Sequence, residues 1–387
     1  MNTMKELFSM QEIEAAYDRL IQKGKRRMHI PLALQQSEDV SSPKWISLLP
    51  VGSDGATTCS VEKDKGLFFR EIYRLLNQVE YNNPHSSRLK FKKYTVTQLT
   101  NTKGKTRQIV KLCLRDQVIT RMLLARLNQA NILTDKATAN PSTFEMACEI
   151  VNLMRTLSGQ YQIIKTDISS FYHSINRDLL LTTLQRDHGS VIGMPVFNLI
   201  KKSVAENKSA HEYTGLPVGM SLSVILGEYY IRAAGIHEIQ SGITVFRYVD
   251  DILIIADKQL NADQILNDLD QKLAAFDLKR SPEKTVLTQA GEPIRFLGME
   301  LSESGIQLDK EKIIQLKKRV QDDINKEFLY YHVANCSGIK VSKPSNKQLV
   351  RLVVNEHRWG IRSRSMPHHL KIERFNRQFI NGSKENN

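Results

Sequence analysis

Apolar residues recur along the chain at two different spacings, which predict alternating helical and extended segments. Helical spacing predicts helices over 5–25, 65–80, 114–130, 143–158, 176–187, 193–207, 221–236, 261–276 and 309–325. Short runs rich in β-branched and aromatic residues predict strands over 161–167, 243–249, 252–256 and 294–302. Residues 90–111 predict a hairpin whose tip, 101–105, is basic.

The composition is that of an ordinary globular protein rather than a disordered, collagenous or disulfide-rich one. The 387 residues are 41% hydrophobic and 25% charged, which is enough material for two or three folding units. No apolar run approaches the roughly 18 residues that span a bilayer, and residues 1–20 lack the apolar core of a signal peptide. The four cysteines form no CxxC pair and have no zinc-site spacing, so we expect free thiols in a reducing compartment. We therefore expect a cytoplasmic protein without membrane contact.

The charge distribution suggests a polyanionic partner. The net charge is +14, and the excess is concentrated in residues 86–125, with a net charge of +9, and in residues 340–387, with a net charge of +8. A soluble chain this basic often binds nucleic acid. Two basic segments predict two surfaces that hold one polyanion, although each segment alone is also explained by a solvated face.

Three aspartates stand where predicted strands end. Asp167 closes the apolar run 161–167, and Asp250 and Asp251 lie between the runs 243–249 and 252–256. Carboxylates at the ends of buried strands are costly unless a cation offsets their charge, and Mg²⁺ prefers such oxygen ligands. Two cations about 3.5–4 Å apart are the arrangement used for phosphoryl transfer. An isolated Asp-Asp pair is also typical of a hairpin turn, and a lone Asp of a helix N-cap.

Six segments resemble the sequence blocks of reverse transcriptases, in the family's order across about 85–302. They are the basic fingers hairpin KGKTRQI, the first catalytic block IIKTDISSFYHSI, the Gly-Pro block TGLPVGMSLSVILGEYY, the Y-x-D-D hairpin FRYVDDILIIA, the lysine loop SPEKT and the primer-grip strand FLGMEL. The sequence departs from the commonest pattern at Val218, where many members have Gln, and at Ser223-Val224, where many have Ser-Pro.

The resemblance implies an α+β right-hand polymerase fold with a small antiparallel palm sheet. Residues 1–80 would be a helical N-terminal extension, 81–302 the fingers and palm, and 303–387 a helical thumb with a basic tail. The implied activity is addition of dNTPs to a 3′ end, with an RNA template, a DNA product and two Mg²⁺ ions, for which Mn²⁺ is a substitute.

The resemblance also implies the catalytic residues. Asp167 and Asp250 would bind the metal ions, with Asp251 assisting. Lys284, in the lysine loop, would lie near the leaving pyrophosphate and act as a general acid.

Four further residues would bind substrate. Tyr172 would lie under the incoming sugar, where its ring would clash with a 2′-hydroxyl, whereas Phe171 would belong to the core and point to the opposite face of a strand. Lys105 and Arg107 would bind triphosphate oxygens. Gly219 would let the backbone approach the base pair.

Two other functions remain open at this stage. One is a palm-type nucleotidyl cyclase, and the other is a non-catalytic RNA-binding module on a polymerase fold. Within the family, GLPVG and DISSFYHSI resemble bacterial defence-associated and abortive-infection reverse transcriptases. That likeness implies a role in antiphage defence and, as further partners, a dedicated non-coding RNA or a neighbouring protein.

Overall fold

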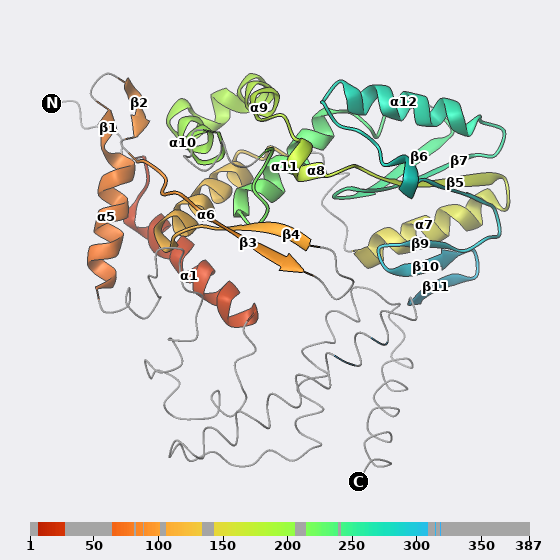
Figure 1. Ribbon diagram of the computed structural model, residues 1–387, viewed down its shortest axis with the longest axis horizontal. Helices are drawn as coiled ribbons and strands as arrows, with labels where there is room; N and C mark the ends of the chain where they lie inside the picture. The colour runs from red at the N-terminus through yellow and green to blue at the C-terminus, as the bar shows by residue number, and fades with distance from the viewer. Residues whose placement is uncertain are drawn as a thin grey trace, which may run out of the picture.

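The computed structural model shows a mixed α+β protein built around a small antiparallel sheet (Figure 1). It describes residues 7–27, 64–80, 83–87, 89–100, 106–133, 143–205, 214–238, 241–308 and the single positions 314 and 318. The predicted helix 309–325, apart from those two positions, and the basic tail 340–387 lie outside the described residues. The α+β class predicted from the sequence is confirmed.

Helices supply most of the described structure. They are α1 (Met10–Arg27), α5 (Lys65–Asn77), α6 (Leu114–Gln129), α7 (Thr143–Leu157), α8 (Phe171–Ser174), α9 (Arg177–Ile192), α10 (Met194–Val204), α11 (Ser221–Ala233), α12 (Ala262–Ala274) and the 3₁₀ turn η3 (Pro282–Lys284). Helices α9 and α12 begin at a capping residue. The side chains of Asn176 and Asn261 accept hydrogen bonds from backbone N–H groups in the first turns of α9 and α12, respectively.

The strands in the described part of the chain form four separate antiparallel sheets. They are β1 (Val79–Glu80), β2 (Asn83–Ser87), β3 (Thr95–Thr100), β4 (Thr106–Lys111), β5 (Tyr161–Asp167), β6 (Ile243–Tyr248), β7 (Asp251–Asp257), β8 (Val286–Gln289), β9 (Ile294–Phe296), β10 (Met299–Ser302) and β11 (Gly305–Leu308). The largest sheet has the order β6-β7-β5-β8, so its two central strands are β5 and β7.

The central sheet is covered on both faces, by two different cores. Ile163 pairs with Ile255 and Ile164 with Ile254, and successive side chains point to opposite faces. The first pair packs with α7 and the sheet β9–β11, while the second packs with α9–α12. Figure 1 shows α12 on one side of the sheet and α7 with β9–β11 on the other. Burial on both faces explains why β7 is apolar without a break from Ile252 to Ala256.

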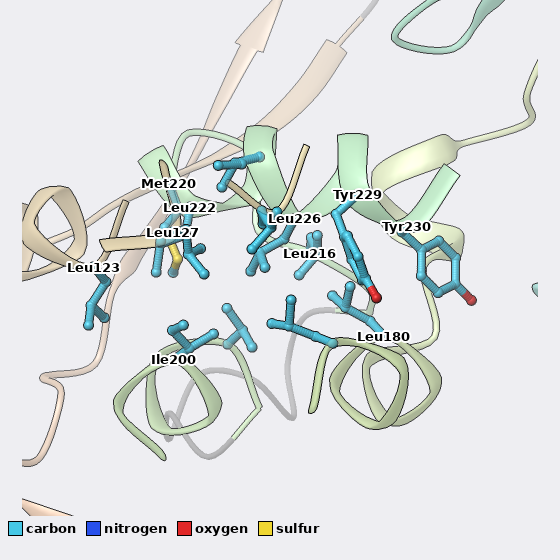
Figure 2. Close-up of a cluster of buried hydrophobic side chains, with 14 of the residues drawn as sticks. Leu123, Leu127, Leu180, Ile200, Leu216, Met220, Leu222, Leu226, Tyr229 and Tyr230 are labelled. Atoms are coloured by element: carbon cyan, nitrogen blue, oxygen red, sulfur yellow. The ribbon is translucent and has the colours of Figure 1, made fainter. Parts of the chain in front are cut away.

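The larger core centres on α11. Figure 2 shows Leu222, Leu226 and Tyr229 among side chains that face those of Leu180 and Ile200 on α9 and α10. This core continues to the N-terminal helices, because buried residues of α1, α5 and α6 belong to the same cluster. The described part of the N-terminal segment therefore shares its hydrophobic core with the rest of the protein.

One predicted strand is wrong. Residues 294–302 form the hairpin β9–β10 instead of a single strand, with Phe296 paired to Met299. The turn residues Leu297 and Gly298 both have positive φ, of 52° and 73°. Positive φ at both positions is the geometry of a two-residue type I′ turn, which a leucine does not signal in a sequence.

The hairpin β3–β4 is attached to the Gly-Pro segment through its second strand. The N–H of Val110 on β4 donates to the carbonyl of Val218 at 2.8 Å. Next to it Gly219 has φ +107°, and a Cβ there would lie 2.6 Å from the Val110 carbonyl oxygen. Only glycine permits both this conformation and this approach.

Replacement of Gly219 with alanine should therefore destabilise the protein more than replacement at another positive-φ glycine. Gly291 is the matched control, because its φ is +88° and a Cβ placed there would meet no atom within 4 Å. Gly291→Ala should cost only the conformational penalty, about 1–2 kcal/mol. Gly219→Ala should add the collision with β4, roughly 1–3 kcal/mol more. Chemical denaturation measures both, and equal losses would contradict the close approach.

Candidate active site

The three aspartates come together at one end of the central strands. Asp167, the last residue of β5, stands directly opposite Asp251, the first residue of β7. The carbonyl of Asp250 accepts a hydrogen bond from the N–H of Ile168 at 3.0 Å. Asp251 thus lies at the start of a strand, and the turn itself consists of Val249 and Asp250.

Burial and mutual repulsion make the charged forms of these carboxyls costly. Burial raises the pKa of Asp250, and the negative charge of Asp167 raises it further, against the opposing charges of Lys284 and Arg107. Burial, then the charge of Asp250, raises the pKa of Asp251. The site therefore favours bound cations or protons.

Lys284 supplies one such cation. Its ammonium group forms an ion pair with Asp167, and this hydrogen bond raises the pKa of the lysine. The lysine lies on η3, in a loop docked against the end of β5, where the N–H of Ser281 donates to the Asp167 carbonyl at 2.8 Å. The structure thus brings Lys284 to the aspartates.

An ion pair with α12 holds the loop that carries Lys284. Arg280 donates from Nε and Nη2 to the two carboxylate oxygens of Asp270, at 3.0 and 2.9 Å. Its Nη1 donates to the Thr285 hydroxyl at 2.8 Å, and that hydroxyl lies 2.9 Å from the hydroxyl of Thr166 on β5. Arg280 was not predicted from the sequence, where it is one basic residue among many.

Tyr172 lies near the aspartates, on the short helix α8. Burial raises its pKa, and the charge of Asp250 contributes next. Its ring is 5.2 Å from that of Phe171 and packs against Gly227, where a Cβ would lie 3.1 Å from the tyrosine ring. Phe171 is buried as predicted, but the predicted reason was wrong, because both residues lie on a helical turn rather than on a strand.

The hairpin β3–β4 contributes a second positive charge. Arg107 lies on β4, and its charge lowers the pKa of Asp250 against the larger effect of burial. Lys105 lies outside the described residues. Gly219 occupies the Gly-Pro segment, where its contact with β4 gives it a structural function whether or not it also meets a base pair.

A buried ion pair behind the turn was also not predicted. Glu228 on α11 accepts from Nη2 of Arg247 on β6 and from Nε of Arg232, the latter at 2.8 Å. The sequence did contain a signal for this pair, because Glu228 and Arg247 each interrupt an apolar run. Charged residues inside such runs are rarely buried unless they are paired.

The chemistry of the carboxylates suits a divalent cation. Among the residues that the structure describes, no three His, Cys, Asp or Glu side chains are gathered as a metal site. Two adjacent strands nevertheless end in facing carboxylates, and one of these is paired with Lys284. Such oxygen donors suit Mg²⁺, which is commonly held by one or two carboxylates together with substrate phosphates.

Comparison with known proteins gives the family. The sequence profile of the family described as "Reverse transcriptase (RNA-dependent DNA polymerase)" matches residues 92–301, more than half of the chain. The chain belongs to the reverse transcriptase family. The family match spans β5, β7, η3 and the three aspartates. No curated protein matches this sequence significantly.

Solved structures of telomerases resemble this chain weakly. One, from Candida tropicalis without its C-terminal domain, has 15% identity and a TM-score of 0.40, over 57% of this chain and 55% of that one. Two others are telomerases in complex with a fragment of telomeric RNA. The Candida albicans structure has 14% identity and a TM-score of 0.42, over 74% and 57% of the two chains. The Candida tropicalis structure has 13% and 0.44, over 77% and 55%.

This chain spans about half the length of these telomerases. In the ranges that the structure describes, no helix is long and apolar enough to cross a membrane. Cys113 and Cys148, the two described cysteines, are free thiols.

Neutralising Asp250 should stabilise the protein at neutral pH. Its folded-state pKa lies above the ordinary value of 3.8, so ionisation costs stability as the pH rises past that value. Asp250→Asn should therefore raise the melting temperature at pH 7, and the gain should shrink to nothing as the pH falls below 3.8.

Asp187 provides a control of opposite sign. A hydrogen bond from Arg186 lowers its pKa, so its ionised form contributes stability at neutral pH. Asp187→Asn should lower the melting temperature at pH 7. A loss of stability in Asp250→Asn at pH 7 would contradict the electrostatic account of the turn.

Proposed function

We propose that this protein synthesises DNA from dNTPs on an RNA template. The observation that carries the proposal is the register of β5 and β7, which puts Asp167 opposite Asp251 and beside the Asp250 turn, within the segment matched by the reverse transcriptase family. The chemistry of paired strand-end carboxylates suits phosphoryl transfer. The basic segment 86–125 and its described hairpin strands suit a nucleic-acid partner.

The reaction exchanges a phosphoanhydride bond for a phosphodiester bond. The primer 3′-hydroxyl gives up its proton to solvent, its oxygen attacks the α-phosphorus of a dNTP, the bond from the α-phosphorus to the bridging oxygen breaks, and pyrophosphate leaves. Asp167, Asp250 and Asp251 would hold two Mg²⁺ ions, which lower the pKa of the 3′-hydroxyl and neutralise the leaving group when bound. Lys284 carries a proton beside Asp167 and would donate it to the pyrophosphate.

The neighbouring residues would bind the nucleotide. Tyr172, packed on Gly227 and close to Asp250, would lie under the deoxyribose and exclude a 2′-hydroxyl. The charge of Arg107, on β4, lowers the pKa of Asp250. Arg107 would contact the triphosphate together with Lys105. Gly219 would lie close to the new base pair.

The activity test uses a labelled DNA primer on an RNA template, with Mg²⁺ and dNTPs. The wild-type protein should extend the primer, and Asp250→Asn should reduce the rate by at least about 10³-fold, since electrostatic stabilisation is the largest single contribution of many active sites. Asp257→Asn, at the far and exposed end of β7, is the matched control and should extend normally.

The products separate the three candidate functions. Extended DNA supports the polymerase, a cyclic nucleotide from NTPs supports the cyclase, and RNA binding without product supports the binding module. Near-normal extension by Asp250→Asn would contradict the assignment of the carboxylates.

Sugar selection tests the place of Tyr172. Tyr172→Ala should increase incorporation of ribonucleotides relative to deoxyribonucleotides by about 10-fold or more, because the ring that would collide with the 2′-hydroxyl is gone. Tyr172→Phe keeps the ring and should keep the wild-type ratio. An unchanged ratio in an active Tyr172→Ala protein would make this residue part of the core only.

The subtype is a further part of the proposal. The likeness of GLPVG and DISSFYHSI to bacterial defence-associated reverse transcriptases supports a role in antiphage defence. Such a role would involve a dedicated non-coding RNA or a neighbouring protein as partner. Sequencing of the nucleic acid that copurifies with the protein would identify the template.

A further inference from the structure

The turn that carries Asp250 has a strained backbone. Val249 has φ +58°, whereas Asp250 is not among the positive-φ residues of the described chain. Positive φ at the first position of a two-residue hairpin turn normally requires glycine. For a β-branched residue it is a genuine outlier, and such strain persists only where the surroundings enforce it.

Two hydrogen bonds enforce this conformation from opposite sides. The N–H of Ile168, just beyond β5, donates to the Asp250 carbonyl at 3.0 Å. Nη1 of Arg247 donates to the Val249 carbonyl at 3.1 Å. The two consecutive peptide groups are therefore tethered, one to the strand that bears Asp167 and the other to a side chain of β6.

The guanidinium of Arg247 is itself fixed. Its side chain is only 4% exposed, and Nη2 donates to the carboxylate of Glu228, which is 11% exposed. Arg232 donates to the same carboxylate at 2.8 Å, so Glu228 holds two arginines. Nε of Arg247 is buried and finds no acceptor among the described residues. Burial of an unsatisfied donor is unfavourable, so the two Nη contacts must outweigh that cost.

We propose that Arg247, held by Glu228, is a positioning residue that keeps the Val249-Asp250 turn in its strained conformation and so directs the Asp250 carboxylate toward Asp167. This inference rests on the proposed polymerase activity for its functional consequence, but its structural content does not. Glu228 follows Gly227, the residue that packs on Tyr172, so one segment of α11 supports both the turn and the sugar-binding ring.

The test is a double-mutant cycle between Arg247 and Val249. Arg247→Met keeps an apolar chain of similar length and removes both Nη contacts, and Val249→Gly adopts positive φ without strain. Arg232 still pairs with Glu228 in the Arg247→Met protein, so the carboxylate is not left alone. Both single variants and the double variant are compared with wild type in primer extension and in thermal unfolding.

In primer extension, Arg247→Met should lower kcat by about 100-fold with a smaller change in KM for dNTP, since small misplacements of reacting groups have effects of this size. Adding Val249→Gly should restore part of kcat, because glycine takes up the turn conformation without being held. Arg232→Met is the matched control: it removes the other arginine from Glu228 and should lower the melting temperature while leaving kcat near wild type.

In thermal unfolding, Val249→Gly should raise the melting temperature more in the wild-type background than beside Arg247→Met, where the turn has already relaxed. The proposal is overturned if Val249→Gly raises the melting temperature equally in the two backgrounds. It is also overturned if the kcat of the double variant is simply the product of the two single effects. If the wild-type protein makes no DNA while the gains differ, the proposed function fails and the positioning role of Arg247 stands.

Discussion

The repulsion between carboxylates at the ends of β5 and β7 is the constraint on which the site depends. Asp167 and Asp251 are paired in register, and Asp250 is tethered beside them. Burial and neighbouring negative charge raise the pKa values of Asp250 and Asp251. Without opposing positive charge, the strand ends would separate or the carboxylates would take up protons. The positive charges of Lys284, Arg107 and Lys165 oppose this effect.

The fold supplies the rigidity that such a site needs. The two central strands are buried on both faces, by α9–α12 on one side and by α7 with β9–β11 on the other. Asp167 and Asp251 therefore stand at the end of a well-packed sheet, and Asp250 lies in the tight turn that joins two of its strands. Arg280 fastens the Lys284 loop to α12, and Arg247 fastens the turn to α11. Lys284 and the Asp250 turn are thus each supported by an arginine that takes no part in the proposed chemistry.

The sequence was sufficient for most of the described helices and for the position of the aspartates beside strand ends, because apolar runs that end in Asp are a local signal. The N-caps Asn176 and Asn261 are local as well. The Glu228–Arg247 pair was missed because its members lie on different elements and only the folded chain joins them. The hairpins at Leu297 and Val249 were missed or misplaced because neither residue favours positive φ. At the Val249-Asp250 turn, tertiary hydrogen bonds override local preference.

The binding of metal ions tests the central claim most directly. Electron paramagnetic resonance counts the Mn²⁺ ions held by the protein in the presence of template-primer and a non-reactive dNTP analogue. The wild-type protein should bind two ions at the site, and Asp250→Asn should lose at least one while its melting temperature does not fall. The same number of ions, bound equally tightly by both proteins, would contradict the claim that the facing carboxylates form a metal-dependent active site.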